Sequence, residues 1–311
     1  MRLDQRGDSA HSIAMTGQDH DFSHLDRAGR ATASVSRNPR LTVNIILGAS
    51  VLLAWLFLGT MAIRGAESRG LNIDAPGDTM LRYLPKLPLP DFFERFFTLC
   101  LAPAPLEGGG AQAGALIVMW FLMAVATMLP SAAPMIRTYC EIADTARIKG
   151  ESVVHPLVLV AGYLSVWLAA SVVFAALTLV VHAFASSAQM LDPVIGPTGA
   201  AALLVAGLYQ LSGLKEACLT KCKNPFSILF SNWSARPGRI LRLGMEQGVW
   251  CLGCCWALML VMFAVGVMNV FWMALIGLFT LIEKQTAARL PTRIAGVILL
   301  VWATALLVVS A

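Results

Sequence analysis

Charged residues are scarce in this sequence. They make up 13% of its 311 residues, whereas hydrophobic residues make up 57%, and the mean hydropathy is +0.70. A typical soluble domain carries about 25% charged residues. The composition therefore excludes an ordinary soluble domain and indicates an integral membrane protein.

The motifs of common enzyme classes are also absent. The sequence has no phosphate-binding glycine loop, no HExxH helix, no Gly-x-Ser-x-Gly turn and no CxxCH haem attachment. No enzyme class is indicated, and a role other than catalysis is favoured. The net charge of +5 requires no nucleic-acid partner, because basic loops that face anionic lipid headgroups account for it.

Long uncharged runs predict an all-α, polytopic bundle of membrane helices. About 18 or more apolar residues are needed to cross a hydrocarbon core of about 30 Å. Residues 249–282 would form one helix of about 51 Å. We expect this run to fold back at residues 266–269, since Gly and Asn commonly end helices. Seven spans are predicted, or six if the shortest run does not cross: 41–63, 114–135, 157–181, 199–214, 249–265, 270–282 and 294–310.

The distribution of basic residues predicts the orientation. Most of the 23 Lys and Arg residues fall in alternate loops of the seven-span arrangement. Because basic loops stay in the cytoplasm, the amino terminus is predicted to be cytoplasmic and the protein to be a multi-pass protein of a bacterial inner membrane. Residues 1–40 are polar and lack apolar periodicity, so they predict a mobile cytoplasmic tail before a transmembrane domain over 41–311.

Five of the seven cysteines form two groups with helical spacing. Cys251, Cys254 and Cys255 are at i, i+3 and i+4, and Cys218 and Cys222 are at i and i+4, so each group shares one helix face. The predicted topology brings both groups to the inner membrane surface. Thiolates select soft ions, and the reducing cytoplasm disfavours disulfides. These five cysteines therefore predict a metal site for Cu(I), with Zn(II) as the alternative.

Methionines extend the pattern more weakly. Met259 and Met262 continue the face of the second cysteine group, and Met119 and Met123 are one turn apart on the second predicted span. Core filling is the competing interpretation, because methionine often packs in cores. Pro130 and Pro134 free backbone carbonyls on that same span, which favours a site nearby. Glu283 and Lys284 are interpreted as side chains that snorkel to the membrane surface.

Three segments carry a resemblance to a known family. "MWFLMAVATMLPSAAPM", "YQLSGLKEACLTKC" and "GVWCLGCCWALMLVMFAVGVMN" resemble the bacterial family described as predicted metal-binding integral membrane proteins, a domain of unknown function. The similarity covers roughly residues 115–310. It implies a membrane location and a bound metal, without an assigned activity or a named ion.

Three functions are consistent with the sequence. The first is a membrane protein that binds a soft metal for transport, delivery or assembly of a metalloprotein, with a metalloprotein or metallochaperone as partner. The second is a thiol oxidoreductase, since Cys251 and Cys254 have the spacing of redox dithiols. The third is a metal-free helical scaffold or a transporter of small solutes.

Overall fold

All regular structure in the described part of the chain is helical. The computed structural model describes residues 39–68, 91–101, 109–185, 197–224, 228–230, 233–267 and 269–310. Residues 1–38 of the predicted tail lie outside the described residues. The helices are α2 (Pro39–Ser68), α4 (Asp91–Leu101), α5 (Gly109–Ile148), α6 (Pro156–Ala185), α7 (Pro197–Gln210), α8 (Gly213–Lys223), α10 (Pro237–Val265), α11 (Val270–Gln285) and α12 (Leu290–Ser310).

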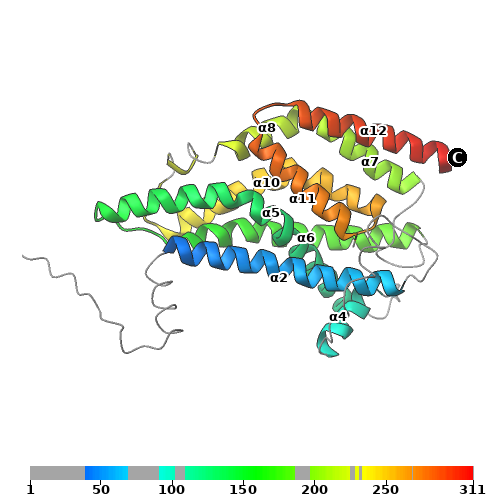
Figure 1. The fold of residues 1–311 in the computed structure, drawn as a ribbon, viewed down its shortest axis with the longest axis horizontal. Coiled ribbons are helices and arrows are strands. Elements are labelled where there is room, and N and C mark those ends of the chain that lie inside the picture. The colour runs from blue at the N-terminus through cyan, green and yellow to red at the C-terminus, as the bar shows by residue number, and fades with distance from the viewer. Residues whose placement is uncertain are drawn as a thin grey trace, which may run out of the picture.

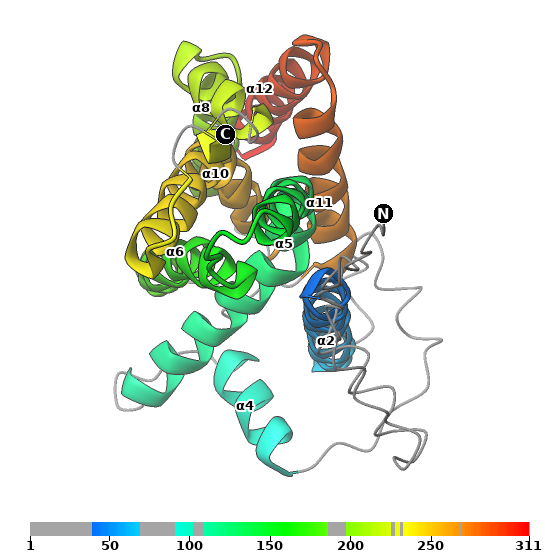
Figure 2. The ribbon, with the colours of Figure 1, turned by 90° about the vertical axis from the view of Figure 1, so that its left-hand side faces the viewer.

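Helix α10 occupies the middle of the bundle. It packs against α6 on one side and against α7 and α8 on the other, while α11 packs against α5 and α12 against α7. Figures 1 and 2 show the long helices lying side by side, with α2 and α4 on one flank and α12 on the opposite one. The second half of α10 is almost wholly buried. Side chains on α10 are therefore within reach of several neighbouring helices.

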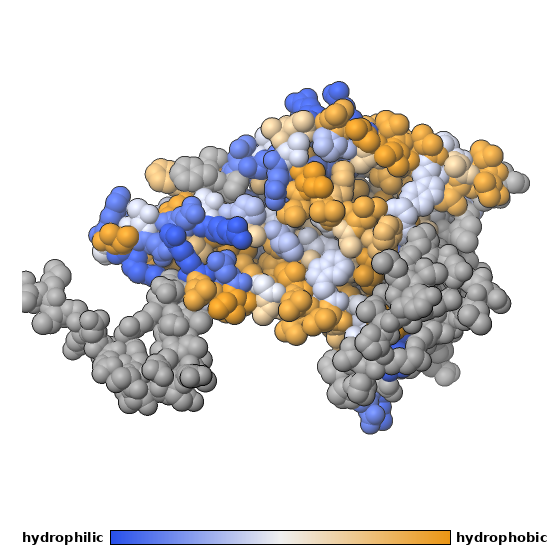
Figure 3. Space-filling view, viewed as in Figure 1, coloured by the Kyte–Doolittle hydropathy of each residue, from blue (hydrophilic) through white to orange (hydrophobic). Residues whose placement is uncertain are grey.

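Five helices are long and apolar enough to cross a membrane: Arg40–Arg64, Gly110–Ile148, Pro156–Val181, Pro237–Val265 and Leu290–Val309. Helices α7 and α11 have 14 and 16 residues, or about 21 and 24 Å, less than a hydrocarbon core of about 30 Å. Hydrophobic residues cover much of the surface in Figure 3, and hydrophilic ones gather near the end of α5 and the start of α12. These features indicate a multi-pass membrane protein, whereas the seven-span count and the cytoplasmic amino terminus stay predictions.

The predicted reversal at residues 266–269 is confirmed. Gly266 ends α10 with a φ of 95°, and the Asn269 side chain accepts a hydrogen bond from the Trp272 amide at 3.2 Å to cap α11. The predicted span 199–214 differs from the structure. Helix α7 ends at Gln210, and Ser212 caps a separate helix α8 by accepting from the Lys215 amide at 3.2 Å. Cys218 and Cys222 therefore lie on their own short helix.

The two prolines in α5 do not end the helix. Pro130 has no N–H to donate to the carbonyl of Ala126, which lies one turn earlier. The indole Nε1 of Trp55 on α2 donates to that carbonyl at 3.0 Å. The freed acceptor is satisfied by a neighbour, as an apolar environment requires, and the bond holds α2 against α5.

Small residues let α6 and α10 approach closely. A Cβ added at Gly244 would overlap the carbonyl oxygen of Leu159, and one added at Gly162 would overlap that of Leu241. A Cβ at Gly248 would lie 2.9 Å from the Cβ of Val166. Gly244 and Gly248 have the four-residue spacing at which membrane helices bring their backbones together. This close contact holds the turn of α10 that follows Gly248 against α6.

We expect Gly244→Ala to destabilise the bundle by about 1–3 kcal/mol, because the added methyl group has no space at the α6–α10 contact. The matched control is Gly114→Ala, because a Cβ added there meets nothing within 4 Å. Alanine also has a higher helix propensity than glycine, so this variant should not be destabilised. Thermal unfolding in detergent, followed by circular dichroism, should show a lower midpoint for Gly244→Ala only. Equal midpoints for the two variants would contradict the proposed close contact.

Candidate metal centre

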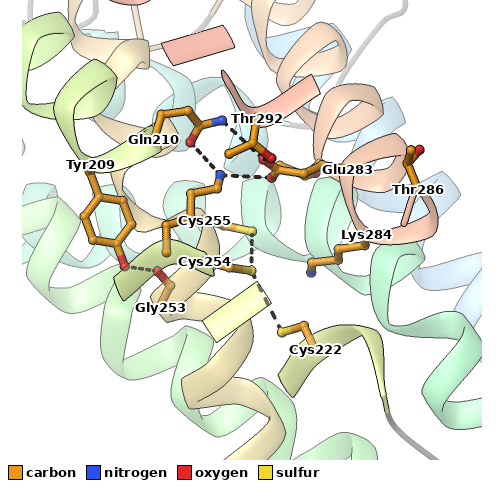
Figure 4. Close-up of polar contacts among 12 residues, drawn as sticks. Tyr209, Gln210, Cys222, Gly253, Cys254, Cys255, Glu283, Lys284, Thr286 and Thr292 are labelled. Carbon is orange, nitrogen blue, oxygen red and sulfur yellow. Dashed lines mark hydrogen bonds and ion pairs between the residues drawn. The ribbon is translucent and has the colours of Figure 1, made fainter. Parts of the chain in front are cut away.

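Cysteine side chains from two helices meet beside the middle of α10. Cys251, Cys254 and Cys255 are buried, and the sulfur of Cys254 lies 3.3 Å from that of Cys255. Helix α8 brings the sulfur of Cys222 to 3.9 Å from that of Cys254. Figure 4 shows the resulting row of three sulfurs. The structure thus brings one cysteine of the first predicted group against the second group.

Cys218 lies against the same helix through a glycine. A Cβ at Gly253 would lie 2.8 Å from the Cys218 sulfur, so the absence of a side chain makes room for the thiol. The hydroxyl of Tyr209 donates to the carbonyl of Gly253 and fixes this stretch of α10 to α7. Both cysteines of α8 therefore contact α10, one at Gly253 and one at Cys254.

The sulfur spacing is close to that of a thiolate metal site. Sulfur ligands at about 2.3 Å from one ion, in trigonal or tetrahedral geometry, lie about 3.8–4.0 Å apart. The 3.9 Å pair of Cys222 and Cys254 fits this value, whereas the 3.3 Å pair of Cys254 and Cys255 is too close. Within the described residues, no group of three or more His, Cys, Asp or Glu side chains is already arranged to hold a metal. A change of thiol rotamer is needed to enclose an ion.

Cys251 has polar partners that differ from those of the other cysteines. Its sulfur lies 3.0 Å from the Lys284 ammonium nitrogen and 3.0 Å from the Tyr163 hydroxyl oxygen. Lys284 also donates to the Ser131 hydroxyl at 2.8 Å. The expectation that Lys284 snorkels to the surface is wrong, because its ammonium group points into the bundle toward sulfur. Lys284 thus places a positive charge directly beside the Cys251 sulfur.

A cavity of about 290 Å³ lies beside these groups. Cys222 and Cys251 line it together with Met135, a methionine outside the predicted ligand set. Ser131 and Pro134 line it from α5, whereas Pro130 is not among its lining residues. Cys222 faces the cavity and also contacts Cys254. This cysteine links the cavity to the buried sulfurs.

A buried ion pair ties α8 to α11. Lys215 and Glu283 are 0% and 2% exposed, and the ammonium nitrogen lies 2.9 Å from the carboxylate. Lys215 also donates to the Gln210 side chain at 2.5 Å, and Thr292 donates to Glu283 at 2.7 Å. These polar partners surround both charges (Figure 4). The surface interpretation of Glu283 is therefore also wrong.

The predicted methionine ligands are buried in the helical core. Met119 and Met123 lie about 18 and 12 Å along α5 from Ser131, and Met259 and Met262 lie about 6 and 10 Å beyond Cys255 along α10, by helical rise. None of these four lines the cavity, which is bounded by Met135 instead. Their burial agrees with core packing. A role as metal ligands stays a prediction.

Two further cysteines stand apart from the cluster. Cys100 on α4 and Cys140 on α5 are buried, and all seven cysteines are free thiols. Burial raises the pKa of the Cys100 thiol to about 12, so this group stays protonated at neutral pH. Cys100 and Cys140 therefore serve as internal controls for chemistry at the clustered cysteines.

Comparison with known proteins identifies one family. The model of the family described as "PpoB2: Copper chaperone" matches residues 117–306. The matched region contains all five clustered cysteines and Lys284, and it leaves out α2 and α4. The comparisons with curated proteins and with solved structures give no match.

We expect Lys215→Met to destabilise the protein by about 3–5 kcal/mol, because it leaves the carboxylate of Glu283 buried without its cation. The double variant Lys215→Met/Glu283→Gln removes both charges and should recover much of the loss. Arg242→Met breaks the exposed pair with Glu246 and should cost less than about 1 kcal/mol. Thermal unfolding in detergent compares the three variants. A double variant no more stable than the single one would contradict the stated cause.

Proposed function

We propose that this chain, which belongs to the PpoB2 copper chaperone family, binds Cu(I) through Cys222, Cys251, Cys254 and Cys255 and passes it to a metalloprotein. The observation that carries the proposal is the approach of sulfurs from α8 and α10 to 3.9 Å. Copper is the cargo here, held for transfer. Cys218 extends the ligand set at the edge of the cluster.

The chemistry of the donors favours Cu(I) over harder ions. Thiolates bind soft ions strongly, whereas Mg²⁺ and Ca²⁺ prefer oxygen ligands. The two nearby carboxylates in the described structure are already paired, Glu283 with Lys215 and Glu216 with Arg289. Zn(II) would also accept thiolates. The family description favours copper between the two.

Cys222 and Cys251 are positioned to receive the ion first. Both line the cavity, while Cys254 and Cys255 lie deeper in the bundle. Cys222 is in contact with Cys254, so the ion can move inward by exchanging one sulfur ligand at a time. Lys284 supplies a positive charge beside Cys251, which offsets the negative charge of a copper bound by two thiolates. The reverse sequence of exchanges releases the ion.

The membrane arrangement belongs to the same proposal. Seven spans, with residues 1–40 as a cytoplasmic tail, would place the cluster near the inner surface of a bacterial inner membrane. Helices α7 and α11 would then be short spans beside the five longer ones. Support comes from the basic residues of α8 and of the starts of α10 and α12, which are typical of cytoplasmic ends.

We expect the anaerobically purified protein to bind Cu(I), and Cys251→Ser/Cys254→Ser/Cys255→Ser to lose that binding, because serine oxygen is a poor ligand for a soft ion. Cys222→Ser should weaken affinity by at least about tenfold, since it removes one sulfur of the closest pair between the helices. Copper content and competition with a Cu(I)-specific chromophoric chelator give the two measurements.

The control variants are Cys100→Ser and Cys140→Ser, which lie outside the cluster and should bind as the parent protein does. Unchanged copper content in the triple variant would refute the proposed site. A protein that binds no copper but forms a reversible disulfide between Cys251 and Cys254 would instead be a thiol oxidoreductase.

A further inference from the structure

We propose that copper reaches the cluster as an anionic Cu(I) complex of a small thiol that carries a carboxylate, and that the cavity beside Cys251 binds this complex before the metal is transferred. The inference rests on the proposed function and names the form of its substrate. Three observations support it: the positive charges that line two adjoining cavities, an unpaired hydrogen-bond donor in the inner cavity, and the volume of that inner cavity.

A second cavity, which adjoins the first and is called the outer cavity here, is lined by charges that are mainly positive. This outer cavity of about 830 Å³ is lined by Lys223, Lys284, Arg289 and Arg293, with Glu216 as its one acidic residue in the described structure. Glu216 is itself paired with Arg289. Lys223 and Lys284 also line the inner cavity, where no Asp or Glu is present among the described lining residues. The positive charges of both cavities would repel a bare cation, whereas they would attract an anion.

An unpaired donor marks the inner cavity as a place for an oxygen-bearing ligand. Gln247 is 4% exposed and lines the cavity, and its side-chain nitrogen is buried with no hydrogen-bond partner. An unsatisfied buried amide is costly and therefore rare. A copper ion cannot accept a hydrogen bond from it. A carboxylate or carbonyl oxygen of a bound molecule can.

The volume of the inner cavity also exceeds what an ion needs. At about 290 Å³ it is close to the smallest small-molecule sites, whose volumes range from about 300 to 1,000 Å³. A molecule of amino-acid or short-peptide size fits this space. Its carboxylate would face Gln247 and the lysines, while its copper would face the sulfurs of Cys222 and Cys251.

The transfer step is an exchange of thiol ligands. The sulfur of Cys251 forms a bond to copper, the bond from copper to the carrier sulfur breaks, and the proton lost by the Cys251 thiol passes to the departing thiolate. Copper stays Cu(I), so no oxidant or reductant is needed. The freed thiol leaves through the outer cavity.

The test compares two copper donors with purified protein under anaerobic conditions. The Cu(I) complex of glutathione carries carboxylates, and the Cu(I) complex of cysteamine carries none. Stopped-flow absorbance follows copper–thiolate formation. Loading from glutathione should saturate with donor concentration, and S-methylglutathione, which keeps the carboxylates but cannot bind copper through a thiol, should compete. Loading from cysteamine should not saturate over the same range.

Two cavity variants sharpen the test. Gln247→Leu and Lys223→Gln should each raise the half-saturating concentration of the glutathione complex at least about tenfold, since each removes a hydrogen bond to a charged group. Because both donors are compared in the same variant, the ratio of their loading rates is independent of any general effect of the substitution on folding. Matched controls are Glu246→Gln, the exposed neighbour of Gln247, and Lys149→Gln in the turn that follows α5.

The outcomes separate this inference from the proposed function. Equal loading from both donors, with no effect of Gln247→Leu on their ratio, overturns the inference while copper binding stands. Loading that saturates with neither donor shows that no complex forms in the cavity before transfer and also overturns the inference. Failure to take copper from either donor refutes the proposed function itself.

Discussion

The ion pair between Lys215 and Glu283 is the interaction on which the arrangement of the site depends. Two charges this deeply buried are stable only together, because each alone would lack compensation in an apolar interior. Lys215 lies on the same face of α8 as Cys218 and Cys222, at i, i+3 and i+7. Glu283 directly precedes Lys284 on α11. One pair thus positions a thiol and an ammonium group against the cysteines of α10.

The cluster is assembled without being closed. Helix packing brings the sulfurs of Cys222 and Cys254 to a separation that a metal would accept, while Cys254 and Cys255 lie too close together for one ion. Rigid helices set the positions of the backbones, and thiol rotamers provide the remaining adjustment. Such a site suits a protein that must give up its ion, because full pre-organisation would favour retention over release.

The features that the sequence predicted correctly are local ones. Helices follow from long apolar runs, the reversal follows from Gly266 and Asn269, and the shared face of Cys251, Cys254 and Cys255 follows from helical periodicity. Pro134 marked the side of the cavity on α5. Each of these conclusions needs only residues within a few turns of one another.

The features that it missed depend on contacts between distant segments. In the sequence Lys284 is a basic residue at a helix end, yet its ammonium group donates a hydrogen bond to Ser131, which lies 153 residues earlier in the chain. Nothing near Tyr163 or Gln247 in the chain signals that both face one cavity. The break after Gln210 was also missed, because the apolar run continues to Leu211 and only the Ser212 cap reveals the new helix. Spacing along the chain could not show which face of α8 would meet α10.

The distance along the chain between the two buried charges has a consequence for biosynthesis. Lys215 is made 68 residues before Glu283, so the nascent chain carries an uncompensated ammonium group while α10 and the loop beyond it are still being added. A charge in that state remains at the water-facing boundary of the lipid, since inserting it alone is unfavourable. The support that this ion pair gives to α8 therefore exists only after α11 has been made. The contact between the sulfurs of Cys222 and Cys254, which depends on the position of α8, is fixed later than the grouping of the three cysteines within α10.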